Sequence, residues 1–524
     1  MKLLSIVLLC TILSVCHGYR ILGVFPFNGK SHFMMFEQLM KALAKRGHQV
    51  DVISSFPLKK PYPNYNDTIV LKAPREFMNN MTYEDVTIVF KDSPAFVVAT
   101  LAGNAVCEHL NDPGIQDLIH NPPKNPPYDV IVMEIFGAHC FAILGEVLKV
   151  PVIGASSSAL YPWTYDFIGN PGNYAFAPSI LLSYPQNMNF WQRTYNFVYT
   201  LYNKWEFMSA SSEQTELLRK YVSPDAPSVR ELERKIAMIL VNSHMSMNGI
   251  KESTPAFVEV GGLHVQEEGV EISPVTIILL EKWMNESTNG FIYFSFGSMV
   301  KIESFPSRHL EIFYNSLEKI APVRVLMKIA NPQELPRDLP KNVLALPWIP
   351  QVKVLKHPNV KAFITHGGLM GTQEAIHYGV PLIGIPLFAD QFINIDTYVR
   401  NNIAVGLDLK TLTQEKMDEA LNAVLNDPKY RDTMRKISKR FLDRPLSPAD
   451  TAVYWVEYII RHGANALRSP AMDLTWWQVE LLDVCAFLLI VVLGVLYLLA
   501  TVVQFMFYLT NSSQHSVPRK KKAA

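Results

Sequence analysis

A stretch in the second half of the chain has the residue types and spacing of an anion-binding turn. The apolar run at residues 360–365 predicts a buried strand, His366-Gly367-Gly368 follows as a turn, and the next segment is helix-like up to Gly379. Glycines let backbone N–H groups approach a ligand, and a helix N-terminus attracts negative charge. With the apolar run at 380–386, the pattern predicts a phosphate-binding βαβ unit, with Gly368 and Gly371 among the candidate binding residues.

Other side chains in the same half have the chemistry to complete a site for a nucleotide sugar. Such a site needs an aromatic surface for the base, acceptors for ribose and sugar hydroxyls, and donors for two phosphates. The candidates are Trp348 and Gln351 for the base, Ser298, His366 and Gly368 for the phosphates, Glu374 for the ribose, and Asp390 and Gln391 for the sugar.

The first half of the chain contributes an imidazole and a carboxylate. His32 stands at the entrance of a helix predicted at 31–46, after a strand predicted at 19–27, and Glu134 lies near the C-terminal end of a strand predicted at 129–135. No G-x-G-x-x-G sequence occupies the first turn, so a dinucleotide is not expected there. An isolated histidine at a helix entrance is usually a polar capping residue, whereas a histidine held by a carboxylate can act as a general base.

The elements around these residues alternate between strand and helix in both halves. Further strands are predicted at 49–54, 150–156, 235–242, 290–296, 323–329 and 343–346, and helices at 413–426 and 428–441. The alternation predicts an α/β protein with two doubly wound domains facing a cleft, at 19–265 and 266–470. We expect residues 58–127 to be irregular. The aromatic stretch at 176–208 can line an acceptor pocket, touch a membrane surface or form core helices.

Composition and the chain ends indicate a membrane-anchored protein. The 524 residues are 49% hydrophobic, and the net charge of +1 gives no sign of nucleic-acid binding. Residues 1–18 predict a cleavable signal peptide, and 484–506 a transmembrane helix. The tail at 507–524 is basic, which favours the cytosolic side, and its last four residues resemble a dilysine retrieval signal. We therefore expect a single-pass type I protein of the endoplasmic reticulum membrane with a lumenal body.

Cysteines and acceptor sequons fit a lumenal body. Outside the signal peptide and the predicted span only Cys107 and Cys140 remain, and they can either pair or stay as buried thiols. N-glycosylation is predicted at Asn66, Asn80 and Asn285. No cysteine or histidine spacing indicates a metal site.

The candidate residues, in this order, resemble the signature of the animal membrane-bound UDP-glycosyltransferases, in particular the insect branch. The matching segments are FSFGSM, WIPQ, FITHGG, EAI, GVPL, IPLFADQ and DLTWWQ. The resemblance implies the GT-B fold and inverting transfer of a hexose from a UDP-sugar to a hydroxyl of small lipophilic acceptors, without a metal or other cofactor. It also implies that His32 is the general base and that Glu134, at a position where the family has an aspartate, orients it.

Two departures from the vertebrate glucuronosyl members bear on the sugar and on the phosphates. Val241 stands where those members have an arginine, which favours a neutral sugar, glucose in particular. Met370 replaces an asparagine, so a phosphate contact is lost or taken over by backbone. The alternatives are a glucuronosyltransferase for the same acceptors and a catalytically silent lumenal binding protein. The sequence leaves the acceptor, and homo- or hetero-oligomerisation, open.

Overall fold

The computed structural model of the chain describes residues 18–72, 81–89, 92–266 and 274–515. The predicted signal peptide apart from Gly18, the sequon at Asn80 and the dilysine signal lie outside these residues. The chain forms two compact units, which divide between Arg468 and Ser469. The first contains two parallel sheets and every candidate site residue.

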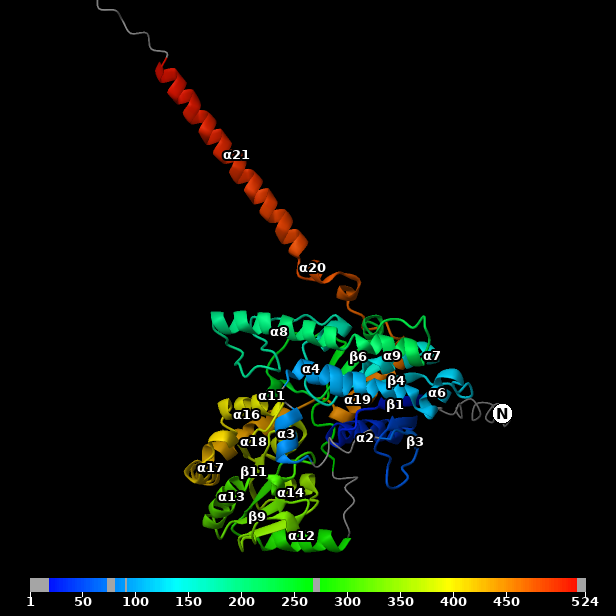
Figure 1. Cartoon of the computed structure of the whole chain (residues 1–524), viewed down its shortest axis with the longest axis vertical. Coiled ribbons are helices and arrows are strands. Elements are labelled where there is room, and N and C mark those ends of the chain that lie inside the picture. Colours follow the sequence, from blue (N-terminus) through cyan, green and yellow to red (C-terminus); the bar gives the residue numbers. More distant parts are fainter. Residues whose placement is uncertain (1–17, 73–80, 90–91, 267–273, 516–524) are drawn as a thin grey trace, which may run out of the picture. The chain divides into compact units, whose positions relative to one another are not determined.

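The first sheet has seven parallel strands in the order β3-β2-β1-β4-β5-β6-β7 (Figure 1). Its strands are β1 (Arg20–Phe25), β2 (Gln49–Ser54), β3 (Tyr65–Val70), β4 (Val130–Glu134), β5 (Val152–Ser156), β6 (Ile236–Val241) and β7 (Phe257–Glu259). All residues of β4, β5 and β6 are buried, because helices cover both faces of a parallel sheet. The strand order reverses between β1 and β4, where doubly wound sheets place ligands at the carboxyl ends of the strands.

The helices of this half are short, with the exception of α2 and α8. They are α2 (Lys30–Lys45), α3 (Tyr83–Val89), α4 (Pro94–Ala99), α5 (Ala105–Cys107), α6 (Pro113–His120), α7 (Ile143–Leu148), α8 (Phe190–Ala210), α9 (Glu213–Tyr221), α10 (Val229–Glu233) and α11 (Met245–Asn248). Short helical turns include η2 (Thr100–Asn104), η4 (His139–Ala142) and η5 (Thr164–Ile168). The described residues of the stretch at 58–127, expected to be irregular, contain β3 and four helices, so that expectation was wrong.

The second sheet has six parallel strands in the order β10-β9-β8-β11-β12-β13. Its strands are β8 (Phe291–Ser295), β9 (Arg324–Lys328), β10 (Val343–Leu346), β11 (Val360–Thr365), β12 (Leu382–Gly384) and β13 (Ala404–Gly406). Its helices are α12 (Pro274–Glu286), α13 (Ser307–Lys319), α14 (Gln351–Lys356), α15 (Leu369–Tyr378), α16 (Gln391–Arg400), α17 (Gln414–Asn426) and α18 (Pro428–Leu442). Two doubly wound α/β domains are thus confirmed, and the order of the second sheet reverses between β8 and β11.

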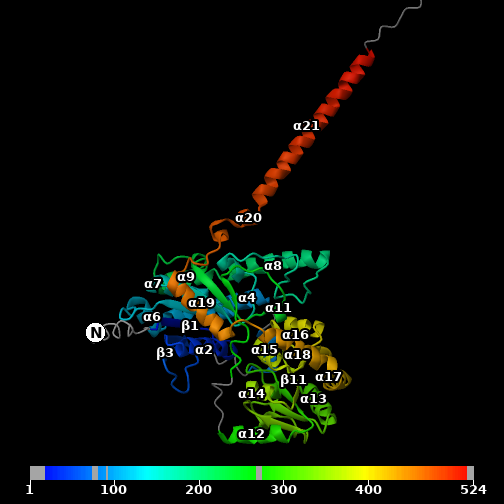
Figure 2. The same cartoon turned by 180° about the vertical axis from the view of Figure 1, so that it is seen from behind.

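Two segments pack against the domain to which the sequence did not assign them. Helix α19 (Pro448–His462) lies beside α2 and buries Val456 and Ile459 in the core of the first sheet, although 266–470 was assigned to the second domain (Figure 2). Conversely, Met81 and Val86 of the first half are buried in the core of the second sheet. Apolar faces are covered by whichever domain offers a complementary surface, so contiguity in sequence does not decide the assignment.

The C-terminal unit contains α20 (Trp476–Val479) and the long helix α21 (Leu482–His515). Residues Leu482–Asn511 form one helix long and apolar enough to cross a membrane, with a mean hydropathy of 2.9. The transmembrane helix predicted at 484–506 lies inside this segment.

Cys107, Cys140 and two of the three predicted acceptor sequons lie within the described residues. Cys107 and Cys140 form a disulfide, which settles the choice that the sequence left open. Asn66 is exposed on the edge strand β3, and Asn285 is exposed on α12, where its Oδ1 lies 3.1 Å from Nε2 of His357. Glycosylation at these positions remains a prediction.

Candidate functional site

His32 and Glu134 come together at the switch point of the first sheet. His32 lies in the first turn of α2, just after β1, and Glu134 is the last residue of β4. His32 Nδ1 lies 2.8 Å from Glu134 Oε1. The side chain of Glu134 is one methylene longer than that of an aspartate, and it still lies within hydrogen-bond distance of the imidazole. With a neutral ring and an ionised carboxylate, this contact places the proton on Nδ1 and leaves the lone pair on Nε2.

Aromatic rings fix the plane of the His32 imidazole. The Phe136 ring lies edge-on to it, with 4.7 Å between the ring centroids, and the Phe27 ring lies 5.0 Å away. The His32 side chain is 23% exposed, whereas Glu134 is 3% exposed. The imidazole is thus held on one side and remains open to a ligand on the other.

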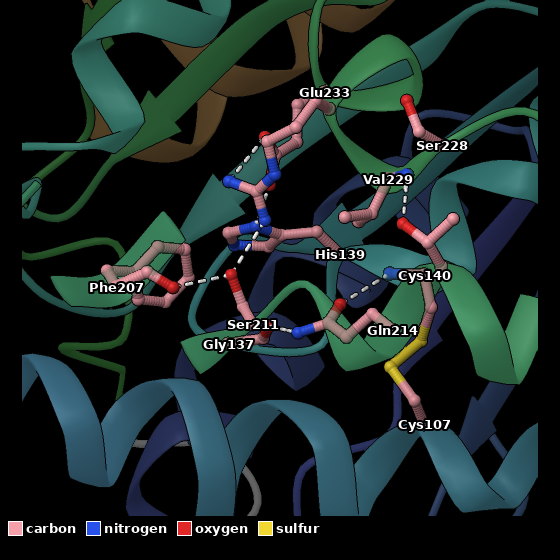
Figure 3. Close-up of polar contacts among 12 residues, drawn as sticks. Cys107, Gly137, His139, Cys140, Phe207, Ser211, Gln214, Ser228, Val229 and Glu233 are labelled. Atoms are coloured by element: carbon pink, nitrogen blue, oxygen red, sulfur yellow. Dashed lines mark hydrogen bonds and ion pairs between the residues drawn. A yellow bond between two sulfur atoms is a disulfide. The ribbon is translucent and has the colours of Figure 1, made fainter. Parts of the chain in front are cut away.

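The loop after Glu134 is clamped by a buried glutamine from α9 (Figure 3). Gln214 Nε2 donates to the carbonyl of Gly137 at 2.8 Å, and its Oε1 accepts from the backbone N–H of Cys140 at 3.1 Å. Gly137 has no room for a Cβ, which would lie 2.5 Å from the carbonyl oxygen of Val98. The disulfide at Cys140 ties the same loop to α5.

A cluster of ionisable side chains holds His139, which lies in the same loop. His139 Nδ1 lies 2.6 Å from Glu233 Oε1, and Arg230 reaches the other oxygen of Glu233 at 3.0 Å. Arg230 also donates to Ser211 Oγ at 2.7 Å. Because separating a buried charged group from its partner destabilises the protein, this cluster keeps His139 in place. Helices α9 and α10 therefore fix the loop that follows Glu134.

In the second sheet, His366 fits between two glycine turns. A Cβ on Gly297 would lie 3.0 Å from its ring, and one on Gly368 would lie 2.7 Å from Nε2. Ser298 is half-buried in the turn with Gly297. Burial, together with a smaller contribution from Lys328, lowers the pKa of His366 to about 4. His366 is thus neutral near pH 7, and its buried Nδ1 has no partner within the described residues.

Lys328 supplies the positive charge that a neutral His366 does not. It ends β9, donates to the carbonyl of Gly297 at 2.6 Å, and places Nζ 5.4 Å from the centre of the Trp348 ring. Burial lowers the pKa of Lys328 to about 8. Sequence reasoning missed this residue. Its position at the carboxyl end of a parallel strand was the available signal.

The base and ribose candidates are joined by a hydrogen bond. Gln351, at the start of α14, donates through Nε2 to Glu374 Oε2 of α15 at 2.5 Å. Gly371 leaves room for this contact, since a Cβ there would lie 3.0 Å from Gln351 Nε2. Trp348 is 43% exposed and so offers a ring face to a base. Burial raises the pKa of Glu374 to about 7.

Asp390 and Gln391 begin α16, but only Asp390 is directed toward the first domain. Gln391 is buried, and its Oε1 accepts from the backbone N–H groups of Leu387 and Phe388, so its carbonyl shapes the loop. Asp390 Oδ2 accepts from Asn394 at 2.8 Å. Ala389, with φ 52°, holds the turn in the left-handed region that favours glycine.

Asp390 lies within electrostatic range of His32 of the first domain. Burial raises the pKa of Asp390, while the bond to Asn394 and the nearby His32 act in the opposite direction. The raised pKa of Tyr161, caused mainly by burial, also includes a contribution from Asp390. The predicted sugar ligand and the predicted general base are therefore close enough to interact electrostatically across the two domains.

Met370 faces the first domain. Its sulfur lies 3.2 Å from Nδ2 of Asn242, and its backbone carbonyl lies 3.0 Å from His264 Nε2. The neighbouring Gln373 donates to the carbonyl of Asn242 at 3.1 Å and accepts from the N–H of Gly262 at 2.8 Å. The substitution to methionine thus adds to the contact between α15 and the end of β6.

Comparison with known proteins agrees with this geometry. Residues 21–515 match the model of a family described as UDP-glucoronosyl and UDP-glucosyl transferase. The chain is 35% identical to UDP-glucosyltransferase 2 of Dactylopius coccus over 99% of both chains. It is 29% identical to UDP-glucuronosyltransferase 2B10 of Homo sapiens, over 91% of this chain and 92% of the human one.

A solved structure shares the fold. The glycosyltransferase VinC in complex with DTDP matches with a TM-score of 0.56 at 17% sequence identity, over 85% of this chain and 100% of that chain. At this identity the match supports the GT-B architecture alone.

We expect donor binding to weaken as the pH falls below 7. Because the pKa of Glu374 is raised to about 7, its carboxylate is converted into the weaker-accepting carboxylic acid below that pH. If UDP-glucose binds the carboxylate, its Kd rises by up to about tenfold for each pH unit below about 7. Titration calorimetry with UDP-glucose between about pH 6 and about pH 8 measures the effect.

The matched variant is Glu374→Gln, which keeps the shape of the side chain and cannot titrate. It should bind UDP-glucose with a Kd that no longer rises toward low pH. A wild-type Kd that is constant over this range would show that Glu374 does not contact the donor.

Proposed function

Because the chain belongs to the UDP-glucoronosyl and UDP-glucosyl transferase family, we propose that it transfers glucose from UDP-glucose to a hydroxyl group of small lipophilic acceptors. That it is a UDP-glycosyltransferase follows from the family match and from its relatives. The observation that carries the proposed transfer reaction is the 2.8 Å contact between His32 Nδ1 and Glu134 Oε1. The same imidazole lies within electrostatic range of Asp390.

In the proposed mechanism, His32 acts as the general base and Glu134 positions it. Nε2 takes the proton of the acceptor hydroxyl while the hydroxyl oxygen attacks the anomeric carbon of the sugar. The bond from that carbon to the diphosphate oxygen breaks as the new bond forms, so UDP leaves and the configuration inverts. Glu134 stabilises the imidazolium produced by the proton transfer. Asp390 is placed to hold a sugar hydroxyl.

The departing diphosphate is proposed to meet three features of the second domain. Lys328 offers an ammonium group, His366 a neutral imidazole nitrogen, and α15 the positive end of its dipole. Among the described residues, no group of three or more histidine, cysteine, aspartate or glutamate side chains is placed to hold a metal ion. We propose that the UDP-sugar is a co-substrate and that no resident cofactor takes part.

Two observations favour glucose over glucuronate. Val241 is fully buried at the end of β6, so this position presents an apolar core side chain where glucuronosyl members have an arginine. The relative at 35% identity is described as a UDP-glucosyltransferase. A glucuronosyltransferase remains the alternative, since relatives of that description also match over most of the chain.

The proposed location is the membrane of the endoplasmic reticulum, with the body in the lumen. The apolar helix at Leu482–Asn511 supports a single membrane span. The disulfide between Cys107 and Cys140 fits an oxidising compartment. In that setting, conjugation of lipophilic molecules would serve detoxification.

Donor choice tests the proposed sugar. Membranes that contain the protein should transfer sugar to a phenolic acceptor from UDP-glucose. Position 241 carries a valine and so offers no cation to the carboxylate of glucuronate. Chromatography of products formed with UDP-glucose and with UDP-glucuronate measures the choice. Turnover with UDP-glucuronate alone would contradict the glucose assignment.

His32→Ala tests the proposed base. Removing a general base typically costs about 10²–10⁴-fold in rate, so kcat should fall by that order while the Kd for UDP-glucose stays near the wild-type value. Initial rates and calorimetry on the same preparation separate the two quantities. Loss of donor binding together with activity would mean that His32 is structural. A wild-type protein that binds UDP-glucose and transfers nothing would indicate the silent binding protein.

A further inference from the structure

Helix α8 has a largely polar buried side and an apolar exposed side. The inward side carries Asn196, Thr200 and Asn203, with Phe207 near the C-terminal end, all 0–3% exposed. Asn196 accepts from the backbone N–H of Ser179 at 2.8 Å and donates to the carbonyl of Tyr174 at 3.1 Å. Helices on the surface of soluble domains show the opposite arrangement, with the apolar side toward the core.

Eight large apolar residues occupy the exposed side of this helix, which we call the aromatic face. They are Phe190, Trp191, Tyr195, Phe197, Val198, Leu201, Tyr202 and Trp205, each between 44% and 75% exposed. Residues 191, 195, 198, 202 and 205 alternate in steps of four and three, which places them along one stripe. Isolated exposed apolar residues are normal on a protein surface, but a contiguous row of this size marks a surface that another apolar body covers.

The charged residues of α8 lie beside the aromatic face and have partners. Lys204 pairs with Asp166 at 2.7 Å. Glu206 accepts hydrogen bonds from Ser93 and from Tyr202. Arg193 donates to the carbonyl of Met188 at 2.8 Å. The face therefore offers apolar and aromatic surface without a cluster of free cations to attract anionic groups.

The composition of the face matches the interfacial region of a lipid bilayer. Trp and Tyr supply four of the five residues of the stripe, and these rings combine an apolar body with a polar group that suits the headgroup level. The same chain carries the apolar segment Leu482–Asn511, which keeps the body near a membrane if it spans one. A two-helix contact with a second copy would bury only a narrow row of residues along each helix. The eight exposed residues of the aromatic face form a wider surface than such a row.

We propose that α8 is a second membrane contact, which lies in the plane of the bilayer interface with its aromatic face among the lipids. Attachment is mainly apolar, since the face has no free basic cluster, so it requires neither anionic lipid nor low salt. The surface is distinct from the site at His32 and from the C-terminal span.

The experiment uses the full-length protein in nanodiscs of phosphatidylcholine that hold one copy each. In a Cys485→Ser background, Thr194→Cys on the aromatic face is labelled with an environment-sensitive fluorophore. The control is Glu415→Cys, exposed on α17 of the second domain. Lipids that carry a spin label near the headgroup should quench the fluorophore at position 194 and leave the one at position 415 unaffected.

Two further measurements keep the result interpretable. Trp191→Gln combined with Trp205→Gln, both at exposed positions, should reduce the quenching at position 194 while sugar transfer stays unchanged. Quenching should persist at high salt. Equal quenching of the two fluorophores in single-copy discs would overturn the proposal. A fluorophore at position 194 that is shielded from solvent only in discs with two copies would overturn it in favour of a contact between copies.

Discussion

The contact between His32 and Glu134 is the constraint on which the proposed catalysis depends. A 2.8 Å distance between Nδ1 and Oε1 selects one tautomer and one ring orientation, and both are needed before Nε2 can accept a proton from a substrate. Much of the first domain serves this contact. The strand order places the two residues at one edge, phenylalanine rings fix the imidazole plane, and Gln214 with the Cys107–Cys140 disulfide fixes the loop that follows Glu134.

Under the proposed function, the second domain has a different electrostatic task, the accommodation of a diphosphate. Its glycine turns leave room for His366, which burial keeps neutral, so the positive charge comes from Lys328 and from the N-terminus of α15. The reciprocal packing of α19 on the first domain and of Met81 on the second ties the halves together. Met370 and Gln373 add a contact between α15 and the end of β6, close to the anion-binding turn.

The sequence was sufficient for the parts governed by local pattern and by motif order. Apolar runs located most central strands to within a few residues, and the family signature placed His32, Glu134 and the donor candidates. Long-range packing was beyond it: an amphipathic helix such as α19 fits either domain, and Gln214 on a polar helix looks like a solvent-facing residue. Lys328 looked like an ordinary strand end. The aromatic residues of α8 were compatible with a core helix, a pocket or a membrane contact until their exposure was known.

The tautomer of His32 is the most direct test of the account. Nitrogen NMR of protein labelled with ¹⁵N-histidine, with His32→Gln as the assignment control, distinguishes a protonated Nδ1 from a protonated Nε2 near neutral pH. The account predicts that the neutral form of the ring carries its proton on Nδ1 and leaves Nε2 free, and that Glu134→Ala abolishes this preference. A proton on Nε2 in the wild-type protein, or a preference for Nδ1 that survives Glu134→Ala, would contradict it.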